Sequence, residues 1–202
     1  MKTIEKSLIF GLIISILMSF TCFHGTCENI SKKILRLHIL ANSDSSIDQA
    51  LKIKVRDKIL KSSGAMFDTA QNKEDAKNIV SQNLGSLKEI AQSEIRRQGF
   101  DYNVDIKLEK TYFNTRKYDE ITLPAGQYDA LRILIGEGKG KNWWCVIFPS
   151  ICLGSAKGNS VMEEILTDDE SDIVEESENY EIKFKVVEIF ESIRSFFANL
   201  KF

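Results

Sequence analysis

Residues 34–55 decide the fold, and they read ILRLHILANSDSSIDQALKIKV. The first seven residues alternate with a period of two, which predicts a β-strand. A short polar loop follows, after which the apolar residues recur at helical spacing. Ser45 or Ser46 suits the N-cap of that helix, and Gln49 would complete a capping box three residues after Ser46. The helix is expected to end at residues 62–64, which read Ser-Ser-Gly.

A second helix and then a change of period follow. Residues 74–98 carry apolar side chains on one helical face, and Gly99 ends that pattern. The order strand, helix, helix, then four strands predicts an α+β fold. We expect a two-layer domain over residues 30–155, with a mostly antiparallel sheet of about five strands against two helices. The four later strands are predicted at residues 102–109, 118–123, 130–135 and 143–148.

The N-terminal segment, residues 1–27, has the character of an export signal. Lys2 and Lys6 precede an apolar run at residues 8–20. As a helix this run would span about 20 Å, which is short of the roughly 30 Å hydrocarbon core of a bilayer. A cleaved signal peptide is therefore favoured, with an uncleaved membrane anchor as the alternative.

The segment beyond residue 155 divides into two parts. Residues 156–180 are rich in Asp and Glu and predict an acidic linker. Residues 181–202 predict an amphipathic helix with too much apolar surface to stay bare in water. Three fates compete for it: packing on the second face of the sheet, a peripheral contact with a membrane surface, or docking in a groove of a partner. Its apolar stripe consists of Ile182, Val186, Ile189, Ile193, Phe196 and Leu200, widened by Phe190 and Phe197.

Little in the sequence points to catalysis, a metal or a cofactor. His38 is the only histidine outside the N-terminal segment, and no nucleophile motif accompanies it. The glycines at residues 136–140 do not form a phosphate-binding loop, because Asn142 follows Lys141 and a strand comes next. A net charge of −2 argues against nucleic acid as a partner. We expect no enzyme activity, no cofactor and no metal.

Two cysteines within the domain, Cys145 and Cys152, are close enough in sequence to pair outside the cytoplasm. Pairing requires the chain to turn back on itself, and Pro149-Ser150 could supply that turn. Two buried free thiols are the alternative. The adjacent Trp143 and Trp144 should lie on opposite faces of their strand, one of them buried and the other presented to a covering helix or to a ligand.

Two stretches of this sequence resemble the signatures of a known family. Residues 37–44 (LHILANSD), 48–52 (DQALK) and 54–57 (KVRD) resemble the first signature of stage II sporulation protein R. Residues 124–132 (PAGQYDALR), 136–149 (GEGKGKNWWCVIFP) and Cys152 resemble the second. Both signatures occur in the expected order, and together they cover roughly residues 34–155.

The resemblance implies a role in intercellular signalling during sporulation. Proteins of this family are secreted from the forespore into the intermembrane space, where they activate a membrane-bound aspartic protease of the mother cell. That protease processes the precursor of sigma E. The resemblance implies no catalytic residue in this sequence.

Loops held on a rigid sheet commonly carry recognition, so we expect the partner to bind two loops and the exposed tryptophan. The alternative function is a secreted module that binds or hydrolyses cell wall, with a tryptophan as its sugar platform. The candidate partner-binding residues are Asn42, Ser43, Asp44, Gly136, Glu137, Gly138, Lys139, Gly140, Asn142, Trp143 and Trp144.

Overall fold

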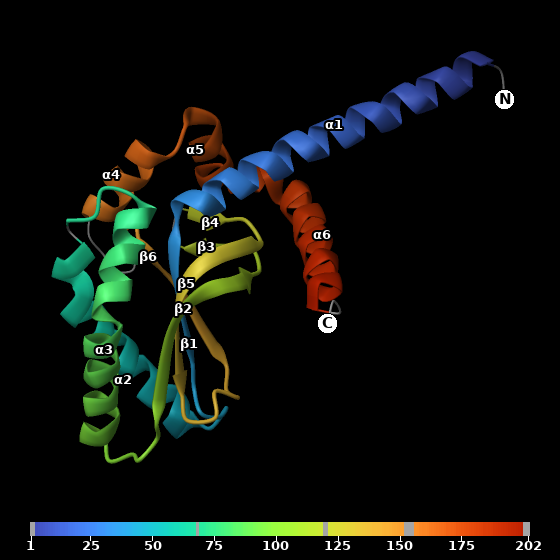
Figure 1. Cartoon of the computed structure of the whole chain (residues 1–202). Coiled ribbons are helices and arrows are strands. Elements are labelled where there is room, and N and C mark those ends of the chain that lie inside the picture. The colour runs from blue at the N-terminus through green and yellow to red at the C-terminus, as the bar shows by residue number, and fades with distance from the viewer. Residues whose placement is uncertain (1–2, 68, 119–120, 152–155, 200–202) are drawn as a thin grey trace. The chain divides into compact units, whose positions relative to one another are not determined.

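A computed structural model describes residues 3–67, 69–118, 121–151 and 156–199 (Figure 1). The chain divides into two compact units, and each is described by itself. The first unit contains residues 1–31, 112–126 and 166–202. The second contains residues 32–111 and 127–165, and it includes the stretches that resemble the family signatures except for residues 124–126.

A four-stranded sheet organises the second unit, in the order β2-β5-β1-β6. Its strands are β1 (Leu35–Leu40), β2 (Val104–Phe113), β5 (Gly126–Ile135) and β6 (Asn142–Phe148). The α+β class is confirmed, but the sheet is mixed, because β1 pairs parallel with β5 and antiparallel with β6. Two helices carry the chain from β1 to the far side of β5, and such a crossover connection permits parallel pairing.

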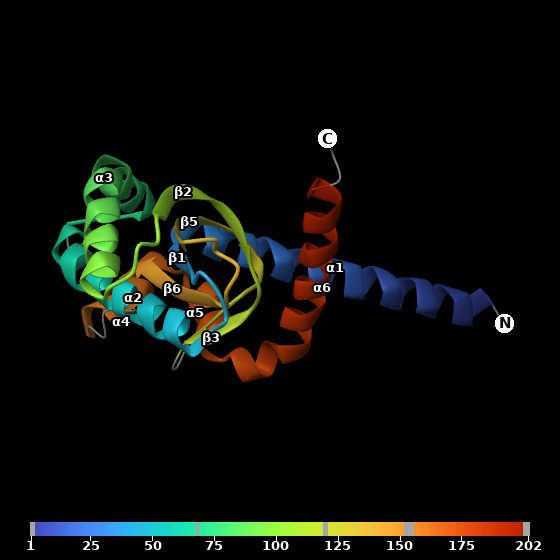
Figure 2. The same ribbon diagram turned by 90° about the horizontal axis from the view of Figure 1, so that it is seen from below.

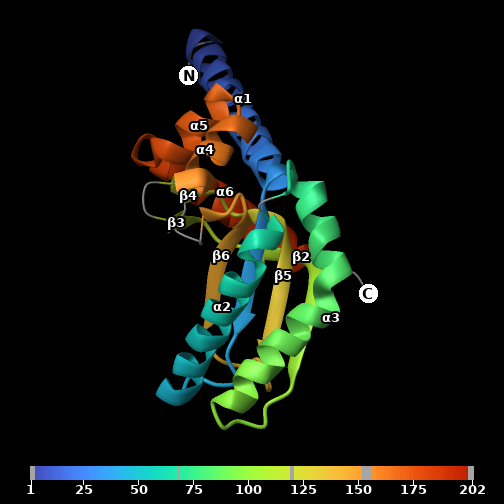
Figure 3. The same cartoon turned by 90° about the vertical axis from the view of Figure 1, so that its left-hand side faces the viewer.

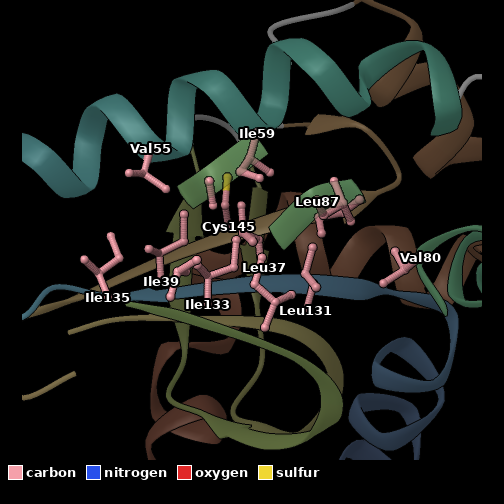
Figure 4. Close-up of a cluster of buried hydrophobic side chains, with 14 of the residues drawn as sticks. Leu37, Ile39, Val55, Ile59, Val80, Leu87, Leu131, Ile133, Ile135 and Cys145 are labelled. Atoms are coloured by element: carbon pink, nitrogen blue, oxygen red, sulfur yellow. The ribbon is translucent and has the colours of Figure 1, made fainter. Parts of the chain in front are cut away.

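Helices α2 (Ser46–Phe67) and α3 (Lys73–Arg97) cover one face of this sheet (Figure 3). The main core lies between the two layers, where Val55 and Ile59 of α2 face Leu37 and Ile39 of β1 (Figure 4). A further helix, α4 (Ala156–Ile165), contributes Val161 and Ile165 to the edge of the core.

Helix α2 continues past the end expected at residues 62–64. The Ser63 hydroxyl donates a hydrogen bond to the Ile59 carbonyl oxygen at 2.8 Å, which satisfies the serine within the helix. Phe67, the last residue of the helix, is buried in the core. Burial of that large side chain favours the extra helical turn over the early stop.

The first unit is mainly helical and holds a small hairpin. It contains α1 (Thr3–Lys33), β3 (Arg116–Tyr118), β4 (Ile121–Leu123), α5 (Asp168–Glu175), η2 (Ser177–Tyr180) and α6 (Glu181–Asn199). The strand expected at residues 118–123 belongs to this hairpin, where Arg116 pairs with Leu123, and not to the main sheet.

The segment expected as an acidic linker is helical. Residues 156–180 form α4, α5 and η2, and the start of α5 carries a capping box between Thr167 and Glu170. Ile173 and Val174 on the same helix are buried. Acidic side chains in the first turn interact favourably with the positive end of the helix dipole. The acidic residues therefore stabilise α5, and its buried apolar residues hold it in place.

The C-terminal helix α6 forms as expected. The side chains of the stripe are exposed, apart from Leu200, which lies outside the described residues. Phe184 and Val187 are buried instead. The Phe184 ring packs edge-on against Phe23 of α1, with 5.5 Å between the ring centroids.

Candidate functional site

The loops that follow β1 and β5 meet at one end of the sheet. Because β1 and β5 are parallel neighbours, both chains leave the sheet at the same edge. The loop after β5 then crosses the end of β1 to enter β6, whose first residue, Asn142, pairs with Leu40. We call residues 41–48 and 136–142 together the loop cluster.

Asn42 joins the two loops of the cluster through its backbone and its side chain. Its Oδ1 accepts a hydrogen bond from the Glu137 backbone N–H at 3.0 Å, and its carbonyl oxygen accepts one from the Lys139 N–H at 3.2 Å. Its Nδ2 donates to Oδ2 of Asp48 at 2.9 Å. The side chain therefore holds the loop cluster to the first turn of α2.

Asp48 is the buried anion of the cluster, with 4% of its surface exposed. Its Oδ2 also accepts a hydrogen bond from the Ser43 hydroxyl at 2.6 Å. Burial alone would raise the pKa of Asp48, but hydrogen bonds from Ser43, Asn42, Tyr102 and Ser45 outweigh it and lower that pKa. Ser45 is the N-cap, because its Oγ accepts from the Asp48 backbone N–H at 3.1 Å.

Lys52, one turn further along α2, stabilises the cluster through hydrogen bonds. Its ammonium donates to the Lys141 carbonyl oxygen and to Oε1 of Gln49, each at 2.7 Å. Burial lowers the pKa of Lys52, although Asp44 opposes this effect. Gln49 does not complete the expected capping box, since its amide donates to the Ser43 carbonyl oxygen at 2.9 Å. Asp44 Oδ1 accepts from the Lys141 N–H at 2.6 Å.

The glycines of the second loop are required by this close approach. Gly136 and Gly138 have φ angles of 59° and 61°, which L-residues with side chains rarely adopt. Gly140 lies so close to the first loop that a Cβ there would overlap the Ser43 carbonyl oxygen. The glycines thus permit backbone contact between the loops.

The predicted residues divide into a supporting set and a displayed set. Asn42, Ser43 and Asp44 are occupied in holding the loops together. Glu137 and Lys139 instead face solvent, as an ion pair of 2.8 Å with 67% and 76% of their side chains exposed. The structure brings the two predicted loops together and leaves the side chains of Glu137 and Lys139, on the second loop, exposed to solvent.

The two tryptophans lie on opposite faces of β6, and each has one ring face covered. Trp143 packs against the main core, and the Arg56 guanidinium carbon lies 4.2 Å from its ring centroid. Trp144 stacks on His38, with ring centroids 3.9 Å apart. His38 Nε2 in turn lies 2.8 Å from Oδ1 of Asn142. Both indoles are half-buried, and neither is fully exposed.

Burial lowers the pKa of His38 to about 4, so its ring is neutral near pH 7. A neutral, stacked histidine supports Trp144 and the start of β6. We therefore assign His38 a structural role in this arrangement.

One group of side chains in the first unit has the composition of a metal site. The possible ligand atoms of His24, Glu28 and Glu191 lie within 4.8 Å of one another. Arg194 already bonds both carboxylates at 3.1 Å, so a guanidinium provides the positive charge there.

Sequence reasoning overlooked Asp48, Lys52 and Tyr102 as members of the cluster. Asp48 and Lys52 are four residues apart on a helix, which places both on one face. This spacing of an acid and a base was the signal available in the sequence. The predicted disulfide stays a prediction, since Cys145 is buried in β6 and Cys152 lies outside the described residues.

Two comparisons with known proteins point to the same family. A family model described as stage II sporulation protein R matches residues 31–158. The chain is also similar to stage II sporulation protein R of Bacillus subtilis (strain 168), with 36% identity over 136 residues. That alignment covers 67% of this chain and 61% of the relative, so the chain spans less than two thirds of the relative's length. No solved structure matches.

Proposed function

The chain belongs to the stage II sporulation protein R family, and on this premise we propose that it is an exported signal that activates a membrane-bound aspartic protease of the mother cell. The family membership itself supports a role in sporulation. In the proposed role, the chain is secreted from the forespore into the intermembrane space and switches on processing of pro-sigma E. It acts as a ligand, with no catalytic residue or cofactor of its own.

The loop cluster is the observation that carries this proposal. Its two loops are joined by hydrogen bonds between residues 95 and 97 positions apart in the sequence. Both loops, with Asp48 and Lys52 beneath them, fall within the region that matches the family. A surface held in one conformation before binding loses little conformational entropy when it docks.

The N-terminal helix supports the export step. Helix α1 has 31 residues and is long and apolar enough to cross a membrane. A signal sequence and a membrane anchor both have these properties, and either would deliver the second unit to the far side of the membrane. The wall-binding alternative has less support, because it would rest on two half-buried indoles alone.

The direct test reconstitutes the chain, the protease and the sigma-E precursor on opposite sides of one membrane in a co-expression host. Precursor cleavage, followed by immunoblot, should appear only when the chain is exported. A charge exchange, Glu137→Lys with Lys139→Glu, keeps the ion pair but reverses its direction on the surface. We expect it to slow cleavage at least about tenfold, since an interface rejects like charges.

A matched control is available on β2. Asp105 and Lys107 also form an exposed ion pair two residues apart, at 2.6 Å. Their exchange should leave cleavage unchanged. Equal cleavage with and without the exported chain would refute the signalling role. Cleavage that depends on the chain but ignores the exchange at Glu137 and Lys139 would refute only the assignment of the surface.

A further inference from the structure

Helix α6 presents an apolar face that the described residues do not cover. Ile182 is 82% exposed, Ile189 62% and Phe196 63%. Such contiguous apolar surface marks an interaction site. The other exposed members of this face are Val186, Ile193 and Phe197, and Phe190 lies at its margin beside Phe20.

The opposite face of α6 is fastened to α1, so the direction of the apolar face is fixed within this unit. Glu191 is 4% exposed, and its Oε1 lies 2.7 Å from Nε2 of His24. Phe184 contacts Phe23, and Arg194 donates to Glu28 at 3.1 Å.

These contacts fall just after the apolar run of α1. The run ends at Phe20, whose ring packs edge-on against Phe190 at 5.5 Å. His24 is four residues further on, about 6 Å along the helix axis. If α1 enters a bilayer, α6 is therefore held at about the depth of the headgroups, which extend roughly 5–8 Å beyond the hydrocarbon core. Helix α6 runs across α1 and not along it (Figure 2).

Charged residues lie beside the apolar face of α6. Lys183, Lys185 and Arg194 are exposed along the helix. Its acids are Glu181, which is exposed, Glu188, which pairs with Lys185 at 3.2 Å, and Glu191, which is buried and bonded to Arg194. Basic residues beside an apolar face are typical of helices that lie in a membrane interface.

We propose that α6 lies in the interface of a phospholipid bilayer, beside an α1 that is retained as an anchor. A bilayer is the occupant we assign because it covers two exposed apolar surfaces of one unit together, that of α6 and residues 8–18 of α1. Cleavage after Cys27 would remove Phe23 and His24, the partners of the buried face of α6. The inference does not rest on the proposed function.

The test uses the full chain in vesicles of phosphatidylcholine and phosphatidylglycerol that contain a phospholipid with a photoactivatable acyl chain. After illumination and digestion, mass spectrometry locates the labelled peptides. Peptides of α1 and α6 should both carry lipid. Ile189→Glu with Ile193→Glu should reduce labelling of α6 at least tenfold and leave α1 labelled. Ile47→Glu is the matched control, since Ile47 is 63% exposed on α2 of the other unit and its replacement should leave the lipid labelling of α1 and α6 unchanged.

Labelled α1 with unlabelled α6 would overturn the inference, as would labelling of α6 that survives both glutamates. Cross-links between α6 helices of two chains, in place of lipid, would assign the face to a second copy.

Discussion

Replacing Asp48 with alanine removes the acceptor that ties the loop cluster to α2. Among the donors that lose their partner are the amide of Asn42 and the hydroxyl of Ser43. A hydrogen bond to a charged group contributes about 1.5–3 kcal/mol, and the lower end applies here because Asn42 and Ser43 are half-buried and can regain water. We expect Asp48→Ala to lower the free energy of unfolding by about 3–4 kcal/mol.

The pH dependence follows from the lowered pKa of Asp48. A carboxyl group whose pKa is lower in the folded state stabilises that state above its ordinary value of about 3.9, and the contribution is lost as the pH falls below it. The stability difference between wild type and Asp48→Asn should therefore stay constant from pH 8 to 5 and shrink below about pH 4.

The assay is urea unfolding of the full chain in mild detergent, followed by the fluorescence of Trp143 and Trp144. Asp57→Ala is the matched control on the same helix. Its carboxylate is 60% exposed and pairs only with Arg56 in the described contacts, so its loss should cost less than about 0.5 kcal/mol. Loss of less than 1 kcal/mol in Asp48→Ala would refute the reasoning, as would a difference from Asp48→Asn that grows in acid.

Three further predictions concern the same unit. Gly140→Ala should lower stability by about 1–3 kcal/mol, since its Cβ overlaps a backbone carbonyl, whereas Gly85→Ala in the open middle of α3 should raise it by about 0.5–1 kcal/mol; equal melting of both variants would contradict this. The pKa of His38, about 4, predicts a ring that NMR finds neutral down to pH 5. The free energy of unfolding should fall by roughly 3 kcal/mol between pH 7 and 4 in the wild type, and this fall should be absent in His38→Gln. Titration of His38 near pH 6.5 would refute the prediction. If Cys145 and Cys152 pair, the secreted protein should weigh two hydrogens less than the reduced chain and Cys145→Ser should lose about 2–5 kcal/mol; two alkylatable thiols in the native protein would exclude the bond.

Periodicity predicted the elements of the second unit well, because a strand or helix that faces one core repeats its apolar residues at a fixed spacing. It could not predict that β5 lies between β1 and β2. The order of the strands depends on where the connection through α2 and α3 returns the chain to the sheet. The segment 156–180 was misjudged because its acidic composition was weighed above the local pattern. Thr167 and Glu170, followed by Ile173 and Val174, already had the signature of a capped helix.

The candidate surface shows a similar limit. Both loops could be selected from their glycines and polar residues. Their hydrogen bonds to each other could not, because these depend on the register of β1 against β6. The same register placed Trp144 on His38, which covers one face of an indole that the sequence alone could not place.

The passage of the β5–β6 loop over the end of β1 makes the loop cluster dependent on completed folding. Contacts between Asn42 and Glu137 close a loop of nearly the whole unit, and so they form only after that closure entropy has been overcome by the rest of the sheet. A chain that is nascent, partly translocated or locally unfolded at β6 does not display the surface. A signal read through this surface would therefore report a finished molecule, and the fold itself would act as the checkpoint before any partner is engaged.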